Sequence, residues 1–130
     1  KNFTNCCTSQ LNSPYSFITS KSKKNQEIIQ NYFKQYQVND VRDIIAPVGT
    51  AHAYDLISLL AKAIKKSESL HRPAIRDALE NIKFHEGLVK HYKPPFQPDR
   101  HDALSVNDLF LAKYDKQGNI IPVSIETSTP

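Results

Sequence analysis

The histidines are the side chains best suited to hold a metal ion, and none of their spacings matches a known site. His85 and His91 are six residues apart, which is too far for a local pair of ligands. His101 is followed by Asp102 in a loop bounded by prolines. These patterns differ from the ligand spacings of metal motifs. We therefore expect histidines that make ordinary hydrogen bonds, and we predict no metal and no cofactor.

The residues that could act as nucleophiles or acids show no catalytic arrangement either. There is no Gly-x-Ser-x-Gly motif, and the three glycines form no phosphate-binding loop. Asp77 and Glu80 are three residues apart, but Arg76 and Lys83 lie among them, which is typical of a solvated helix face. The only cysteines, Cys6 and Cys7, are adjacent, so we expect buried or free thiols. We predict that the protein is not an enzyme.

His52 and Tyr54, beside Thr50, are better candidates for binding a ligand. They open the most regular amphipathic stretch in the sequence, and the start of a helix presents unpaired N–H groups. In the alternative interpretation, Tyr54 packs in the core and His52 caps the helix locally. The spacing of these residues leaves both interpretations open.

Residues 49–64 are the stretch that must position this candidate site. Apolar residues recur there with helical spacing, namely Leu56, Leu59, Leu60, Ala63 and Ile64. Thr50 is a suitable N-terminal cap, and Asp55 lies where negative charge suits the helix dipole. Positive charge suits the other end, where Lys62, Lys65 and Lys66 lie. We expect a helix here, with the rest of the chain packed around its apolar stripe.

The elements before this helix are predicted from the same kinds of signal. Residues 1–20 are rich in Asn, Ser and Thr and are expected to form loop, with a short strand near residues 3–7. A second helix should begin after Ser20 or Ser22 and end near Gln37. Residues 41–48 are β-branched and contain Pro47, which favours a short or edge strand.

The second half of the chain predicts one more helix and several strands. Pro73 suits a first helical turn, and the inner face of this third helix comprises Ile75, Ala78, Leu79 and Ile82. Residues 88–92 should form a short strand, followed by an extended loop with Pro94, Pro95 and Pro98. Residues 108–114 and 119–123 should pair as a hairpin around a turn at 115–118, with a frayed tail at 124–130. This order predicts an α/β or α+β fold.

Length and charge limit the remaining possibilities. The 130 residues suffice for one modest domain, and no apolar run is long enough to span a membrane. The net charge is +4, with the densest lysines at Lys21, Lys23 and Lys24. We interpret this group as a solvated loop and helix start, and we predict no nucleic-acid partner.

Several of these segments together resemble one known family. Residues 53–56 and 59–64 are similar to the late helix of solute-binding proteins of branched-chain amino acid type ABC importers. Residues 76–82 resemble that family's next helix, and Phe84, Gly87 and residues 95–104 resemble the loop region that follows. Residues 111–118 and 122–123 resemble its closing hairpin, and Phe33 and Tyr36 fit its preceding helix. The resemblance covers about residues 25–123.

The resemblance implies the type I periplasmic-binding fold of leucine/isoleucine/valine-binding-like proteins, in which two α/β lobes close on a ligand. The chain would then be a single partial domain over residues 1–130, the C-terminal portion of a protein more than twice as long. In this family the segment before the late helix reaches the ligand cleft. Transferred to this sequence, the ligand-binding residues are Gly49, Thr50, Ala51, His52 and Tyr54.

The same resemblance implies the partners and the location. The ligand would be an amino acid or a similar small polar solute, and the second partner a membrane ABC permease. The location would be periplasmic or extracellular, and no catalysis would be involved. Two alternatives stay open. One is a ligand-sensing domain of a receptor, and the other is a small independent interaction module with a basic surface.

Overall fold

A computed structural model describes residues 7–11, 17–18, 21–114 and 120–123. The chain divides into two compact units, which we describe separately. One unit comprises Lys1–Asn12 with Ser105–Pro130, and the other comprises Ser13–Leu104. No helix among the described residues is both long enough and apolar enough to cross a membrane.

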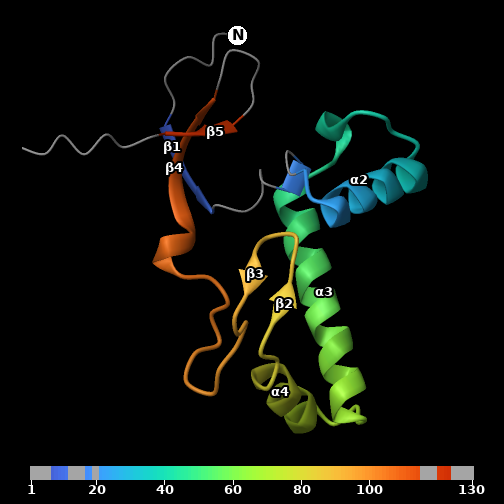
Figure 1. Cartoon of the computed structure of the whole chain (residues 1–130), viewed down its shortest axis with the longest axis vertical. Helices are drawn as coiled ribbons and strands as arrows, with labels where there is room; N and C mark the ends of the chain where they lie inside the picture. The colour runs from blue at the N-terminus through green and yellow to red at the C-terminus, as the bar shows by residue number, and fades with distance from the viewer. Residues whose placement is uncertain (1–6, 12–16, 19–20, 115–119, 124–130) are drawn as a thin grey trace, which may run out of the picture. The chain divides into compact units, whose positions relative to one another are not determined.

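Helix α2 (Lys23–Tyr36) is the first long element of the larger unit (Figure 1). Ser22 is its N-terminal cap, because its hydroxyl accepts the backbone N–H of Asn25 at 3.1 Å. The helix ends at Gln37, which adopts a left-handed conformation with φ of 55°. The second predicted helix is therefore confirmed, and Ser22 rather than Ser20 is its cap.

The segment between the first two helices is not a strand. Val41–Asp43 form a 3₁₀ helix, η1, and the carboxylate of Asp40 accepts the backbone N–H of Arg42 at 2.8 Å. Pro47 then begins the next α-helix. The prediction of a strand over residues 41–48 is wrong because a capped turn and a helix-initiating proline outweigh the β-branched composition.

Helix α3 (Pro47–Ser67) is the central element of the larger unit, and its start differs from the prediction in one respect. Its N-cap position is Ala46, with φ of 46°, and no side chain caps it. Thr50 lies inside the helix, and its hydroxyl donates to the carbonyl oxygen of Ile45 at 3.2 Å. Thr50 is thus not the cap, since Pro47 already fits the first helical position.

The buried side of α3 also differs from the predicted stripe. The buried residues recur every four positions, at Ala51, Asp55, Leu59 and Ala63. Leu56 and Leu60 are 57% and 45% exposed, so their prediction as inner residues is wrong. The helix is turned so that Asp55 faces the interior, where it binds backbone N–H groups.

Helix α4 (Arg72–Glu80) packs against the C-terminal half of α3, as Figure 1 shows. Together they form a core of Leu59, Ala63, Ala78 and Ile82, and Ile75, Leu79 and Phe96 pack against it. Pro73 lies in the first turn of α4. The third predicted helix and its inner face are confirmed.

A short hairpin runs beside α3 (Figure 1). Its strands are β2 (His85–Glu86) and β3 (His91–Tyr92), with His85 opposite Tyr92. Leu88 and Val89 lie in the connecting turn, so the predicted strand over residues 88–92 is correct only for its last two residues. A loop follows, in which Gln97 and Arg100 exchange backbone hydrogen bonds at 2.9 and 3.0 Å.

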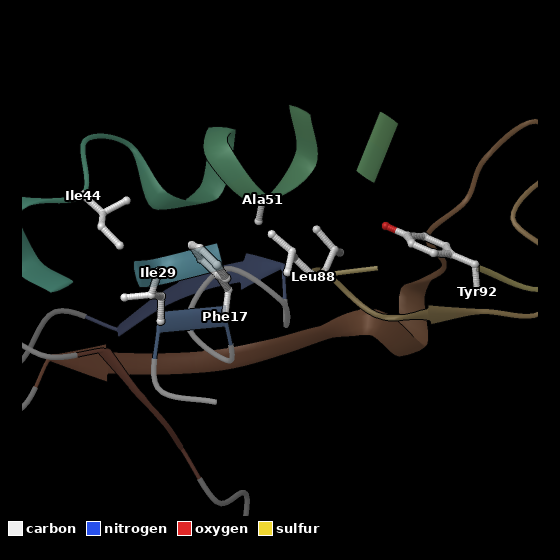
Figure 2. Packing of buried hydrophobic residues seen from close by; sticks show 7 residues of the cluster. Phe17, Ile29, Ile44, Ala51, Leu88 and Tyr92 are labelled. Atoms are coloured by element: carbon white, nitrogen blue, oxygen red, sulfur yellow. The ribbon is translucent and has the colours of Figure 1, made fainter. Parts of the chain in front are cut away.

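The main core of the larger unit brings together residues from distant parts of the chain. Its buried members are Phe17, Ile29, Ile44, Ala51, Leu88, Val89 and Tyr92. Figure 2 shows Ala51 pointing from α3 toward Leu88 and Phe17. This core therefore joins α2, the start of α3 and the hairpin turn.

The smaller unit is a three-stranded antiparallel sheet. The strands β1 (Cys7–Leu11), β4 (Leu109–Tyr114) and β5 (Ile120–Pro122) lie in the order β1-β4-β5. A 3₁₀ helix, η2 (Val106–Asp108), precedes β4. The pairing of β4 with β5 confirms the predicted C-terminal hairpin. The described N-terminal strand begins at Cys7, where the strand predicted near residues 3–7 ends. Cys6, the turn at 115–118 and the tail at 124–130 lie outside the described residues.

Candidate functional site

The predicted ligand-binding residues occupy the first two turns of α3, but they do not share one surface. Gly49 is exposed, and Thr50 is half-buried. Ala51 is fully buried in the main core. His52 and Tyr54 are both half-buried. The structure therefore brings Gly49 and Thr50 to the surface at the helix start and places the side chain of Ala51 inside the protein.

The turn before α3 is fixed by contacts with α2. The backbone N–H of Ile45 donates to the hydroxyl of Tyr32 at 3.2 Å. Tyr32 in turn packs on Tyr36, with ring centroids 4.4 Å apart. Since the carbonyl of Ile45 also accepts the Thr50 hydroxyl, both polar groups of this residue are bound. The start of α3 is thus held in place by α2 rather than by a side-chain cap.

His52 and Tyr54 are in different environments. Nε2 of His52 is buried and has no hydrogen-bond partner among the described residues. Tyr54 packs against the main core, as the core interpretation of this residue predicted. The ammonium group of Lys24 lies 5.6 Å from the centroid of the Tyr54 ring. Nε2 of His52 is therefore a polar atom at this helix start that the described residues leave without a partner.

Asp55 is the most strongly bound polar side chain in this region, and the sequence prediction did not include it in the site. Its carboxylate accepts the backbone N–H of Leu88 at 2.7 Å and that of Val89 at 2.9 Å. The hydroxyl of Tyr92 donates to it at 3.1 Å. Because only 2% of Asp55 is exposed, these three donors replace water around the charge. Asp55 therefore fixes the hairpin turn against α3.

Lys24 links the first turn of α2 to the same hairpin. Its ammonium group donates to the carbonyl oxygen of Glu86, in addition to its contact with Tyr54. A single lysine thus contacts the hairpin and the start of α3. Lys24 therefore connects the predicted site residue Tyr54 to Glu86 of the hairpin.

A polar cavity of about 170 Å³ lies between the start of α2 and the hairpin turn. Its lining residues are Ser22, Asn25, Glu86, Gly87, Leu88, Val89, Lys90 and His91. None of the five predicted site residues lines it. Gly87 in a short loop was the one sequence signal that could have indicated this place, since glycine often marks a close approach of backbone to another group.

His85 is a buried histidine with an altered acidity. It is 2% exposed, and its Nδ1 lies 2.9 Å from Nζ of Lys62. Burial, followed by the positive charge of Lys62, lowers the pKa of His85 below its ordinary value of 6.5. Because the lysine donates, Nδ1 is the unprotonated nitrogen, and His85 is neutral at neutral pH.

The acidic pair predicted to be solvated lies on α4. Arg76 binds Asp77 at 2.5 Å and lies 3.8 Å from Glu80. Nε2 of His101 is 3.0 Å from the Glu80 carboxylate. This charged group borders a second, largely apolar cavity of about 190 Å³, which Leu79 and Phe96 also line. Among the residues that the structure describes, no three His, Cys, Asp or Glu side chains gather as metal ligands would.

Comparison with known proteins gives one structural relationship. No family model and no curated protein matches the sequence. The chain is similar to the crystal structure of a periplasmic binding protein type 1 from Bordetella pertussis Tohama I, with a TM-score of 0.69 and 19% sequence identity. The similarity covers 90% of this chain and 33% of that chain, so this chain spans about a third of its length. The chain therefore has a partial α/β fold that corresponds to one third of a type 1 periplasmic binding protein.

Proposed function

We propose that this chain is part of the solute-binding protein of an ABC importer. It would bind an amino acid or a similar small polar solute and deliver it to a membrane permease. The proposal places the protein in the periplasm or at the cell exterior, with no catalysis and no cofactor. The observation that carries it is the similarity of 90% of the chain to a type 1 periplasmic binding protein.

The proposed binding wall is the start of α3, where Gly49, Thr50 and His52 lie. No side chain among the described residues caps this helix. The backbone N–H groups of Val48 and Gly49 in its first turn would donate to an anion such as an amino acid carboxylate. Nε2 of His52 is a buried polar atom next to this wall that has no partner among the described residues. Ala51 and Tyr54 would support this wall from the core side.

Thermal unfolding in the presence of candidate solutes tests the proposal. A panel of amino acids, small amides and organic acids is added to the purified chain, and the unfolding midpoint is measured. A solute that binds only the folded state raises the midpoint, because 100-fold excess over its dissociation constant adds about 2.7 kcal/mol. We expect one amino acid class to raise it. A cooperative transition that no member of the panel shifts would contradict solute binding by this chain.

A charge-matched pair of variants locates the site. Gly49→Glu places a carboxylate at the exposed start of α3, where it would repel the ligand carboxylate while suiting the helix dipole. Gln30→Glu makes the same charge change at an exposed position of α2. We expect the midpoint shift to be lost in Gly49→Glu and retained in Gln30→Glu. The receptor alternative would give the same result, because it uses the same site with a different partner.

A further inference from the structure

The largely apolar cavity beside α4, which we call the α4 cavity, takes no part in the proposed solute site. Its volume is about 190 Å³, and its lining residues are Arg76, Leu79, Glu80, Phe96 and His101. Ala63 on α3 shares a core with α4. At about 1.5 Å per residue, Ala63 lies about 21 Å along the helix from Gly49. The α4 cavity and the start of α3 are therefore separate places on the larger unit.

The interior of the α4 cavity suits an apolar group. Leu79 and Phe96 are its two apolar lining residues, and both also pack against the core shared by α3 and α4. An apolar cavity of about 150 Å³ is large enough to hold benzene. The α4 cavity can therefore take a six-membered ring or an alkyl group of similar size. The ring of Phe96 gives such a group an aromatic face to pack on.

Glu80 is the charged lining residue that is least accessible to water. Its side chain is 16% exposed, whereas those of Arg76 and His101 are each 62% exposed. The Glu80 carboxylate accepts a hydrogen bond from Nε2 of His101 at 3.0 Å. Because little water screens this carboxylate, its attraction for a positive group is stronger than that of an exposed carboxylate.

Arg76 neutralises Glu80 only in part. Nε and Nη2 of Arg76 bind Asp77 at 2.9 and 2.5 Å, whereas Nε lies 3.8 Å from the Glu80 carboxylate. One guanidinium group thus lies beside two carboxylates. The two segments that line the cavity, residues 72–80 and 96–102, together carry four carboxylates and three guanidinium groups. These segments are therefore acidic, although the net charge of the whole chain is +4.

Internal hydrogen bonds hold the loop that carries Phe96 and His101. Between these two residues, Gln97 and Arg100 exchange backbone hydrogen bonds. The guanidinium group of Arg100 donates to the carbonyl oxygen of Pro94 at 3.3 Å and to that of Asp102. A ligand does not have to order this wall of the cavity, which favours binding.

From these observations we propose that the α4 cavity binds a small organic ammonium ion. The ring or alkyl body of the ion packs between Leu79 and Phe96, and its ammonium group donates to the carboxylate of Glu80. The face of the Phe96 ring attracts the same positive charge. An anion fits this cavity less well, because Nε and Nη2 of Arg76 already bind Asp77. This site does not depend on the proposed solute site, so either proposal can fail without the other.

Three probes with the same ring and different charges test the proposal: benzylammonium, benzyl alcohol and benzoate. Each is added separately to the isotope-labelled 130-residue chain, and the backbone amide signals of Leu79, Glu80 and Gln97 are followed by NMR. We expect saturable shifts with benzylammonium, and an affinity for benzyl alcohol that is lower by about tenfold. An affinity for benzyl alcohol or benzoate that equals or exceeds that for benzylammonium overturns the proposal. The absence of saturable shifts at these signals with benzylammonium overturns it as well.

A charge-matched pair of variants tests the role of Glu80. Glu80→Gln removes the negative charge and keeps an oxygen that can accept from His101. Its affinity for benzylammonium should fall by about tenfold, with the affinity for benzyl alcohol unchanged. Glu27→Gln makes the same change at an exposed position of α2 and should alter neither affinity. If Glu80→Gln retains its affinity for benzylammonium, or loses affinity for both probes, the assignment of the ammonium group to Glu80 is wrong.

Discussion

Asp55 on α3 and Gly87 in the hairpin turn are so close that no side chain fits between them. A Cβ atom on Gly87 would lie 2.7 Å from the carboxyl carbon of Asp55 and 2.7 Å from the ring of Tyr92. This approach lets the carboxylate reach the backbone N–H groups of Leu88 and Val89. The pair therefore sets the position of the hairpin on α3, and with it one wall of the polar cavity.

Gly87→Ala should destabilise the protein, because the added methyl group overlaps Asp55 and Tyr92. We expect a loss of about 1–3 kcal/mol in the free energy of unfolding, measured by urea denaturation. Gly49→Ala is the control, since the nearest atom to its Cβ is that of Ala46 at 3.9 Å. This variant should gain about 0.5–1 kcal/mol, because alanine favours helix over glycine. Equal effects at the two glycines would contradict the close approach.

Removing the Asp55 carboxylate should cost more than removing one of its donors. Asp55→Ala leaves two buried N–H groups without an acceptor, which costs about 3 kcal/mol of unfolding free energy. Tyr92→Phe removes a single hydrogen bond and should cost about 1–2 kcal/mol. Both values come from the same denaturation experiment. A smaller loss for Asp55→Ala than for Tyr92→Phe would mean that Asp55 does not fix the turn.

Neighbouring leucines on α3 test which side of the helix is buried. Leu59 is 2% exposed and Leu60 45%. Leu59→Ala should therefore cost about 2–5 kcal/mol, because it leaves a cavity in the core shared with α4. Leu60→Ala should change the free energy of unfolding by less than about 0.5 kcal/mol. A larger loss for Leu60→Ala than for Leu59→Ala would mean that Leu60 lies on the buried side of α3, as predicted from the sequence.

The buried neutral His85 should make stability fall at acidic pH. Its pKa is lowered in the folded state, so the unfolded chain takes up the proton first as the pH drops through the ordinary value of 6.5. The stabilisation of the folded state by neutral His85 is thus complete above pH 6.5, and it is lost as the pH falls toward the pKa of His85 in the folded state. We expect a weaker pH dependence of unfolding in His85→Gln than in the unaltered protein.

Two further variants separate the causes of this pH dependence. Lys62→Gln removes the positive charge next to Nδ1, so the pKa of His85 should rise and the pH dependence should weaken. His71→Gln alters an exposed histidine and is the control for the change of residue type. If the free energy of unfolding of His85→Gln depends on pH as steeply as that of the unaltered protein, the conclusion that His85 is buried and neutral is wrong.

The helices could be predicted from the sequence because their signals are local. Ser22 and Pro73 mark helix starts, and the spacing of Ile75, Ala78, Leu79 and Ile82 identifies an inner face that the structure confirms. The pairing of β4 with β5 was predictable for the same reason, since two apolar stretches flank the sequence Asp115-Lys116-Gln117-Gly118, which is typical of a hairpin connection. In each case neighbouring residues decide the conformation.

The errors occur where a distant contact decides the outcome. On α3, Leu56 and Leu60 fit an amphipathic stripe as well as Leu59 does, but the backbone N–H groups of Leu88 and Val89 turn Asp55 inward. Asp55 and its partner Leu88 are 33 positions apart in the sequence, and no residue near Asp55 indicates that its side chain is buried. The polar cavity was missed for the same reason, because its walls come from Ser22 and from residues 86–91. Similarly, Ala51 is buried by Phe17 and Leu88, which the sequence does not place beside it.

The most direct test of the proposed function is an NMR titration of the isotope-labelled chain with the amino acid class that shifts its unfolding. The backbone amide signals of Gly49, Thr50 and His52 report on the start of α3, and those of Gly87, Leu88 and Lys90 report on the polar cavity. We predict saturable shifts at the first group that are lost in Gly49→Glu. Saturable shifts confined to the second group, or none at any ligand concentration, would contradict the assignment of the solute site to the start of α3.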